Sequence, residues 1–225
     1  MRLFLVESEE LDVWGQLALD EWMLDRAGGD VFLRFHSWTG GPAASFGYAQ
    51  RYSGAVAELP PHLRANCARR LTGGGLLRHG ADVTFSCVFP YSRAAWNPLG
   101  AFRILHEAIG RAFQEAGFDV CLVAAPVERP ARRGFRVPVL LDVMGLDGEL
   151  MVRGAFRKRR GSVLYEGSVR MDGARSRADS IVAAVQYGLE TAIHRADWEP
   201  YPWKPDGEFA RLREKYRAPA WLERW

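Results

Sequence analysis

Cysteine is scarce in this chain, with only Cys67, Cys87 and Cys121 among 225 residues. The three are widely separated, and neither a Cys-x-x-Cys pair nor a Cys/His spacing typical of zinc sites occurs. An odd and scattered set of this kind argues against a disulfide framework and supports no metal site. We therefore expect each cysteine to be a small, buried, apolar side chain.

Long apolar runs are also missing. No stretch of the sequence reaches the roughly 20 apolar residues that span a bilayer. The first segment, Met1 to Glu10, turns acidic after four apolar residues, which is too short a run for a secretory signal. The sequence therefore predicts a cytoplasmic protein without a membrane partner.

Lysine is the third scarcity. Only Lys158, Lys204 and Lys215 occur among 30 basic residues, so the other 27 are arginines, and the net charge is only +3. A compositional bias of the source genome explains this most simply. The basic residues form no concentrated face with interleaved aromatic side chains, so we expect no nucleic-acid partner. The densest cluster could meet an acidic protein surface or a phosphate, and it consists of Arg153, Arg157, Lys158, Arg159 and Arg160.

Internal repeats and low-complexity linkers are absent, and the chain is long enough for one full hydrophobic core. We predict a single domain over residues 1–225, in which 196–225 form a C-terminal tail that wraps the domain. Antiparallel hairpins between helices favour a mixed α+β fold over a doubly wound nucleotide fold. Helical patterns cover 13–26, 101–116 and 177–195, and strand patterns cover 2–6, 31–36, 43–46, 82–89, 118–123, 139–143, 149–156 and 162–171. We expect a short helix or loop at 53–63, irregular chain at 126–138 and a tight basic turn at 157–161.

One stretch stands out, because three consecutive glycines follow two arginines and a histidine comes four residues later. An ordinary loop needs one glycine or two, whereas three let the backbone pass close to another group with its N–H groups directed at a ligand. The spacing fails the Gly-x-Gly-x-x-Gly dinucleotide fingerprint. The adjacent arginines suit a carboxylate or a phosphate. The predicted substrate-binding residues are Arg70, Thr72, Gly73, Gly74, Gly75 and His79.

Four segments in order make the chain resemble the lipoate–protein ligase and octanoyltransferase family. They are Gln16–Glu21, Leu33–Trp38 with Ala44–Gln50, Arg69–Gly75 with His79, and Gly154–Arg157 with Gly161–Ser168. The resemblance covers roughly residues 10 to 190. It implies the fold of biotin protein ligases and class II aminoacyl-tRNA synthetases, with a largely antiparallel central sheet flanked by helices.

The resemblance also implies an activity. Members attach a lipoyl or octanoyl group to a lysine of a lipoyl-carrier domain, either from free lipoate or octanoate with ATP and magnesium, or from an acyl carrier protein. The glycine loop would lie along the acyl chain or its adenylate. Arg70 would then hold the carboxylate or phosphate. His79 would orient the loop as a packed histidine or accept a proton.

The family's essential lysine is missing from this sequence. The family segment Gly-x-Lys-x-x-Gly-x-Ala aligns with 148–155, where Leu150 or Met151 stands at the lysine position, depending on the anchor. Neither side chain can hold a carbonyl oxygen or neutralise negative charge. Arg153 could supply the charge from a shifted place, and Lys158, expected in the turn, is a weaker substitute.

Some octanoyltransferases carry the acyl group on a cysteine. Cys87, in the strand after the glycine loop, is a candidate if it faces the pocket, and otherwise it is a buried strand residue. Three hypotheses stay open: an acyltransferase or ligase with a rearranged catalytic charge, a non-catalytic relative that binds an acyl or acyl-adenylate-like ligand, and a biotin-type ligase.

Overall fold

The computed structural model describes residues 1–8, 10–36, 38, 41–91, 97–124, 140–148 and 151–224. The irregular segment expected at 126–138 lies outside the described residues. Leu150 and the side chain of Met151, at the lysine position, lie outside them too. None of the helices in the described ranges is long and apolar enough to cross a membrane.

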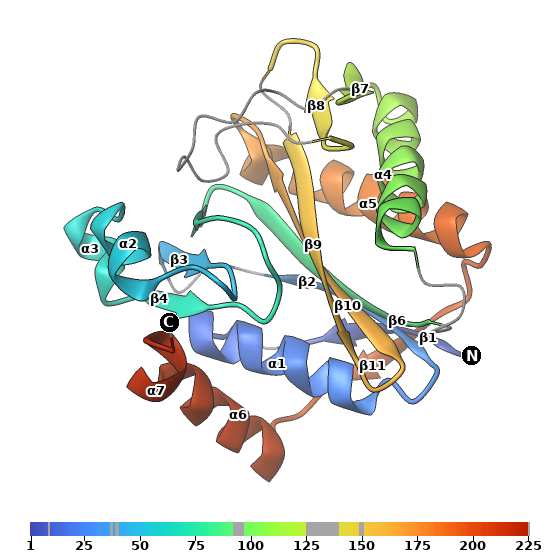
Figure 1. The fold of residues 1–225 in the computed structure, drawn as a ribbon. Helices are drawn as coiled ribbons and strands as arrows, with labels where there is room; N and C mark the ends of the chain where they lie inside the picture. Colours follow the sequence, from blue (N-terminus) through green and yellow to red (C-terminus); the bar gives the residue numbers. More distant parts are fainter. Residues whose placement is uncertain are drawn as a thin grey trace.

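An eight-stranded mixed sheet forms the centre of the fold (Figure 1). Neighbouring strands pair antiparallel except at β1, which runs parallel to both of its neighbours. The expected α+β fold with a largely antiparallel sheet is thus confirmed. In spatial order the strands are β11 (Trp198–Pro202), β1 (Leu3–Glu7), β2 (Val31–His36), β6 (Val83–Pro90), β10 (Ser162–Arg170), β9 (Met151–Arg159), β8 (Val143–Gly145) and β7 (Val120–Leu122).

Helices cover both faces of this sheet because successive side chains of its strands point to opposite sides. Leu33 packs in the core shared with α4 (Pro98–Glu115) and α5 (Ala178–Ile193), whereas its neighbour Phe32 packs in the core shared with α1 (Val13–Arg26) and α6 (Gly207–Arg217). Two hydrophobic cores on either side of one sheet therefore hold the molecule together.

A second, three-stranded sheet carries the glycine stretch. Its strand order is β4 (Cys67–Arg69), β3 (Ala43–Phe46) and β5 (Leu77–His79). Two short helices, α2 (Tyr52–Ala57) and α3 (Pro61–Arg64), occupy the segment expected to be helix or loop, and they pack with this sheet around Phe46. The small sheet lies beside one end of α1 (Figure 1), so it faces the polar residues on that helix and on the main sheet.

The hairpin turn predicted at 157–161 is present but shorter than expected, because β9 continues through Arg159. Only Arg160 and Gly161 form the hairpin turn, with φ of 48° and 87°, as a two-residue turn between twisted strands requires. Of the basic side chains in this segment, Arg159 pairs with Glu21 and Asp25 of α1. Lys158, placed in the turn by sequence, is a strand residue.

The C-terminal residues build regular structure. β11 adds a parallel strand to the edge of the main sheet, and α6 packs on α1 through Phe209, Leu212 and Tyr216. The last helix, α7 (Pro219–Leu222), lies against the small sheet, where Trp221 donates its indole N–H to the carbonyl oxygen of Arg69 at 3.1 Å. The end of the chain thus helps to hold the glycine stretch in place.

Candidate functional site

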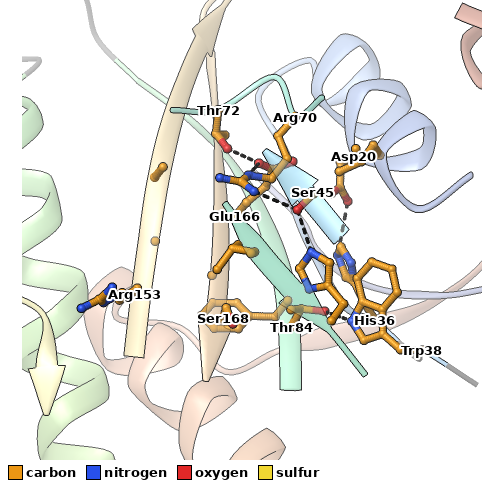
Figure 2. Close-up of a pocket in the computed structure, with 17 residues that line it drawn as sticks. Asp20, His36, Trp38, Ser45, Arg70, Thr72, Thr84, Arg153, Glu166 and Ser168 are labelled. Carbon is orange, nitrogen blue, oxygen red and sulfur yellow. Dashed lines mark hydrogen bonds and ion pairs between the residues drawn. The ribbon is translucent and has the colours of Figure 1, made fainter. Parts of the chain in front are cut away.

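A pocket lies between the small sheet, α1 and the main sheet (Figure 2). Apolar side chains and two glycines form part of the lining, and polar groups converge in the rest. The lining residues are Leu17, Asp20, His36, Trp38, Ser45, Arg70, Thr72, Leu77, His79, Thr84, Phe85, Arg153, Gly154, Ala155, Glu166, Gly167 and Ser168.

Arg70 is the best-held cation of this pocket. Its Nη2 donates to the carbonyl oxygens of Gly73 at 3.1 Å and Gly75 at 2.8 Å, and its Nη1 donates to Ser45 Oγ at 2.8 Å. Burial lowers the pKa of the guanidinium to about 10, opposed by the carboxyl group of Glu166. Arg70 therefore stays charged at neutral pH and has a fixed orientation.

The neighbouring arginine has a different task. Arg69 is completely buried and donates to the carbonyl oxygens of Tyr48, Gln50, Trp221 and Leu222. These acceptors belong to the loop after β3 and to α7. Arg69 thus fixes the C-terminal helix, and Arg70 alone of the pair reaches the pocket.

The three glycines serve a close contact between chain segments. A Cβ on Gly47 would lie only 2.1 Å from the carbonyl oxygen of Gly74, and Gly74 has a φ of 90°. Gly73 and Gly75 offer their carbonyl groups to Arg70. Within the described part of the chain, the pocket lining includes Thr72 but none of the three glycines.

His79 connects two groups at the small sheet. Its Nδ1 lies 2.9 Å from Asp82 Oδ2, and its Nε2 lies 2.6 Å from Ser45 Oγ. Trp38 stacks on the imidazole with ring centroids 4.2 Å apart and planes 7° apart. Asp82 also accepts from Ser168 Oγ at 3.0 Å. The imidazole is therefore fixed in both position and plane.

A buried acidic group faces Arg70. Glu166 accepts a hydrogen bond from the Thr72 hydroxyl, and one of its oxygens lies 3.9 Å from Arg70 Nε. Burial, followed by repulsion from Asp20, raises the pKa of Glu166 to about 8. The carboxyl group of Glu166 is thus protonated at neutral pH.

Asp20 remains the charged member of this acidic pair. Arg34 Nη1 lies 3.4 Å and His36 Nε2 lies 3.5 Å from Asp20 Oδ1. These partners outweigh the effect of burial and lower the pKa of Asp20. The polar end of the pocket therefore holds one carboxylate and one neutral carboxyl group near the charge of Arg70.

The three candidate catalytic residues lie at different places in the structure. Arg153 lines the pocket, but its Nε pairs with Asp142 Oδ2 at 2.9 Å, and Figure 2 shows its guanidinium directed away from Ser45 and Arg70. Lys158 is exposed on β9, with its ammonium 5.6 Å from the centre of the Tyr91 ring. Neither side chain offers its charge at the Arg70 end of the pocket.

Cys87 lies in the core beneath α4 and α5, outside the described pocket lining. Burial raises the pKa of its thiol to about 12, which removes the thiolate that a nucleophile needs. The alternation of β6 therefore points this residue away from the pocket, and the alternative of a buried strand cysteine is confirmed. Cys67 is buried as expected, but Cys121 is exposed, which corrects the expectation for that residue.

Sequence reasoning assigned no role to Ser45, Asp82 or Glu166. Ser45 and Glu166 both stand inside segments that carry the family resemblance, and Asp82 follows His79 by three residues. A His-x-x-Asp spacing at the start of a strand was the available signal. The described residues contain no group of three or more His, Cys, Asp or Glu side chains arranged to hold a metal ion.

Sequence comparison identifies the family of this protein. The family described as the lipoyl protein ligase A/B catalytic domain matches residues 12–192. This match covers most of the chain, so the protein belongs to that family.

Individual relatives agree with this assignment. The octanoyltransferase LipM of Exiguobacterium sp. is 32% identical over 151 residues, which are 61% of this chain and 53% of that protein. The chain spans less than two thirds of the length of the curated relatives it matches first. A solved lipoate protein ligase from Thermoplasma acidophilum, described as bipartite and solved with its E2 lipoyl domain, has the same fold, with a TM-score of 0.69 at 19% identity over 99% of this chain and 96% of that one. Lipoate-protein ligase A bound with ATP gives a TM-score of 0.67 at 21% identity over 99% and 98%.

Proposed function

We propose that this protein is an acyltransferase that moves a medium-chain acyl group, octanoyl or lipoyl, to a lysine of a lipoyl-carrier domain. One observation carries the proposal: in a member of this family, the pocket joins an apolar lining to a fixed Arg70. The apolar part suits the acyl chain, and Arg70 suits the carbonyl oxygen on which negative charge develops.

The charge at the polar end of the pocket favours an acyl thioester over ATP-activated octanoate as the acyl donor. Asp20 is a buried carboxylate at the polar end of the pocket, and a carboxylate repels a triphosphate. An acyl thioester on a carrier protein brings no such charge to the reacting carbon, so we take it as the donor.

Arg70 would act without rearrangement. Its bonds to Ser45, Gly73 and Gly75 already fix the guanidinium before a substrate enters. A fixed donor stabilises a developing oxyanion better than one that must reorganise during the reaction. The short glycine segment then serves as a scaffold for Arg70, which is how the predicted loop would contribute to substrate binding.

The test is a transfer assay with two donors. The protein is incubated with an apo lipoyl domain and either octanoyl-acyl carrier protein, or octanoate with ATP and magnesium, and the lipoyl domain is weighed by intact mass spectrometry. We expect one added octanoyl group with the carrier-protein donor only. Transfer from octanoate and ATP alone would make the protein a ligase, and the absence of product with both donors would contradict the proposal.

A second candidate function is supported by the missing lysine. Leu150 or Met151 stands at the lysine position, and Arg153 pairs with Asp142 instead of pointing at the reacting end. A non-catalytic relative would bind octanoate or lipoate and release it unchanged. Tight binding by calorimetry together with no transfer in the assay above would favour this function. The expected cytoplasmic location stays a prediction.

A further inference from the structure

The hydroxyl of Ser45 lies within a relay of three side chains. Burial opposes ionisation of Asp82, but the net pKa shift is downward, and the carboxylate accepts from the Gly80 N–H at 3.0 Å and from Ser168 Oγ at 3.0 Å. An ionised carboxylate only accepts hydrogen bonds, so the 2.9 Å contact requires the proton on His79 Nδ1. His79 Nε2 then has a free lone pair and accepts the Ser45 hydroxyl proton across 2.6 Å.

The same hydroxyl oxygen has a cation beside it. Arg70 Nη1 donates to Ser45 Oγ at 2.8 Å, so the oxygen gives its proton to a base and accepts a bond from a guanidinium (Figure 2). A base on one side and a fixed positive charge on the other are the two features that activate a serine nucleophile. All three groups line the pocket where the acyl carbonyl would sit.

We propose that Ser45, His79 and Asp82 form a nucleophilic triad, and that Ser45 carries the acyl group as an oxygen ester between donor and acceptor. This proposal rests on the proposed acyl-transfer function and names its covalent intermediate. Nothing in the sequence motifs assigned a role to Ser45.

The acyl group is transferred in two steps. Ser45 Oγ attacks the carbonyl carbon of the acyl thioester while its proton moves to His79 Nε2; the carbon–sulfur bond then breaks, and the proton passes to the leaving sulfur. In the second step the neutral amine of the carrier lysine attacks the ester carbon and gives a proton to His79 Nε2. The bond to Ser45 Oγ then breaks, and His79 passes that proton to the oxygen. Asp82 keeps its charge and holds the ring in the required tautomer.

A second serine–histidine pair in the fold can be compared with Ser45 and His79. Ser86 Oγ also lies 2.8 Å from a histidine, His36 Nε2, and Asp20 Oδ1 approaches that same nitrogen at 3.5 Å. Carboxylate and hydroxyl therefore meet one nitrogen, and His36 Nδ1 has no hydrogen-bond partner among the described residues. No proton relay across the ring connects these groups, and Ser86 is not part of the pocket lining found there.

The experiment uses p-nitrophenyl octanoate, which reports acylation without any carrier protein. The purified chain is mixed with the ester, the release of p-nitrophenolate is followed by stopped flow, and the quenched protein is mapped by peptide mass spectrometry. We expect a burst of about one equivalent and an octanoyl group on Ser45. Neutral hydroxylamine should leave the label in place, because it cleaves thioesters far faster than oxygen esters.

Variants separate a catalytic serine from a structural one. Ser45→Ala should abolish the burst and label, Ser86→Ala should keep both, and Asp82→Asn should slow acylation by roughly 10³–10⁴-fold, as in other serine triads. Ser45→Cys is the decisive variant, because it should retain labelling but make the label sensitive to neutral hydroxylamine. A purely structural hydroxyl would not produce this change in chemistry.

The outcomes distinguish this inference from the proposed function. Label on any cysteine, or a labelled Ser45→Ala protein, would overturn the triad. Octanoylation of the lipoyl domain without a burst or label would also overturn it while leaving acyl transfer intact. A labelled Ser45 with no transfer to the lipoyl domain would support the triad and contradict the transferase function.

Discussion

The protonated carboxyl group of Glu166 should make the stability of the protein depend on pH. Its side chain is packed between Thr72, Arg70 and Asp20. Burial and the charge of Asp20 raise its pKa from an ordinary 4.5 to about 8. Glu166→Gln keeps the shape and an oxygen that accepts from Thr72, but removes the titration.

The sign and size of the contribution of Glu166 to the free energy of unfolding follow from proton linkage. Between pH 4.5 and about 8 the folded chain holds a proton on Glu166 that the unfolded chain has lost. The favourable contribution is complete below the unfolded pKa and is lost as pH rises through the folded pKa. For these two values, the free energy of unfolding falls by about 1.5 kcal/mol between pH 6.5 and 8.

Two buried histidines also affect stability, and their pKa values determine the pH range in which the effect of Glu166 is best measured. Burial lowers the pKa of His36, and lowers that of His106 to about 4, so both affect stability mainly below their ordinary value of 6.5. Their contribution rises with pH in that lower range, opposite to that of Glu166. At pH 6.5 the two histidines are about half protonated in the unfolded chain, and this fraction falls as the pH rises. Because Glu166→Gln keeps both histidines, the difference in slope between the variant and the wild type reports Glu166.

Urea unfolding at several pH values from 6.5 to 8 measures the effect. The wild-type chain should lose stability across this window, and Glu166→Gln should lose about 1.5 kcal/mol less by the linkage above. Glu115→Gln, an exposed change on α4, should keep the wild-type slope. Equal slopes for the wild type and Glu166→Gln would show that Glu166 is ionised in the folded state, which would refute the reasoning.

Three further predictions concern packing. Gly47→Ala should destabilise the fold by roughly 1–3 kcal/mol in urea unfolding because its Cβ would meet the carbonyl oxygen of Gly74 at 2.1 Å, whereas Gly54→Ala, in open space on α2, should not destabilise it. Arg69→Lys cannot reproduce a guanidinium that bonds several backbone carbonyl groups, so proteolysis within 218–224 should accelerate while the main sheet keeps its hydrogen-exchange protection. Ala155→Leu should fill part of the pocket and cut transfer of octanoyl groups about tenfold or more relative to butyryl groups; equal loss with both chain lengths would place the acyl chain elsewhere.

Apolar periodicity in the sequence predicts some helix boundaries correctly and places others several residues away. The helix over Val13–Arg26 was predicted to the residue, and Asp12 caps it by accepting from the Gly15 N–H at 2.8 Å. The next long helix begins at Pro98, three residues before the predicted start. Its Asn97-Pro98 pair carries the cap and first-turn signals, which apolar periodicity alone does not report.

The site was predictable only where its residues are neighbours in the chain. Arg70, Thr72 and His79 lie in one contiguous stretch, and all three line the pocket. Glu166 comes from a strand nearly a hundred positions later, and its approach to Thr72 depends on the pairing of β10 with β6 and β9. Contacts between residues far apart in the chain depend on the register of the sheet, and one sequence without its fold does not specify them.

The missing family lysine and the Ser45 relay have a common physical explanation. The resemblance gives that lysine the acyl carbonyl and the phosphate to hold, and Leu150 can do neither. A thioester donor brings no phosphate, and the carbonyl needs only one fixed cation beside an activated nucleophile. Arg70 provides that cation and His79 provides the base, both through Ser45 Oγ. Restoring the lysine by Leu150→Lys should therefore leave the burst with p-nitrophenyl octanoate unchanged, and a large gain in that burst would show that Arg70 does not fill the role.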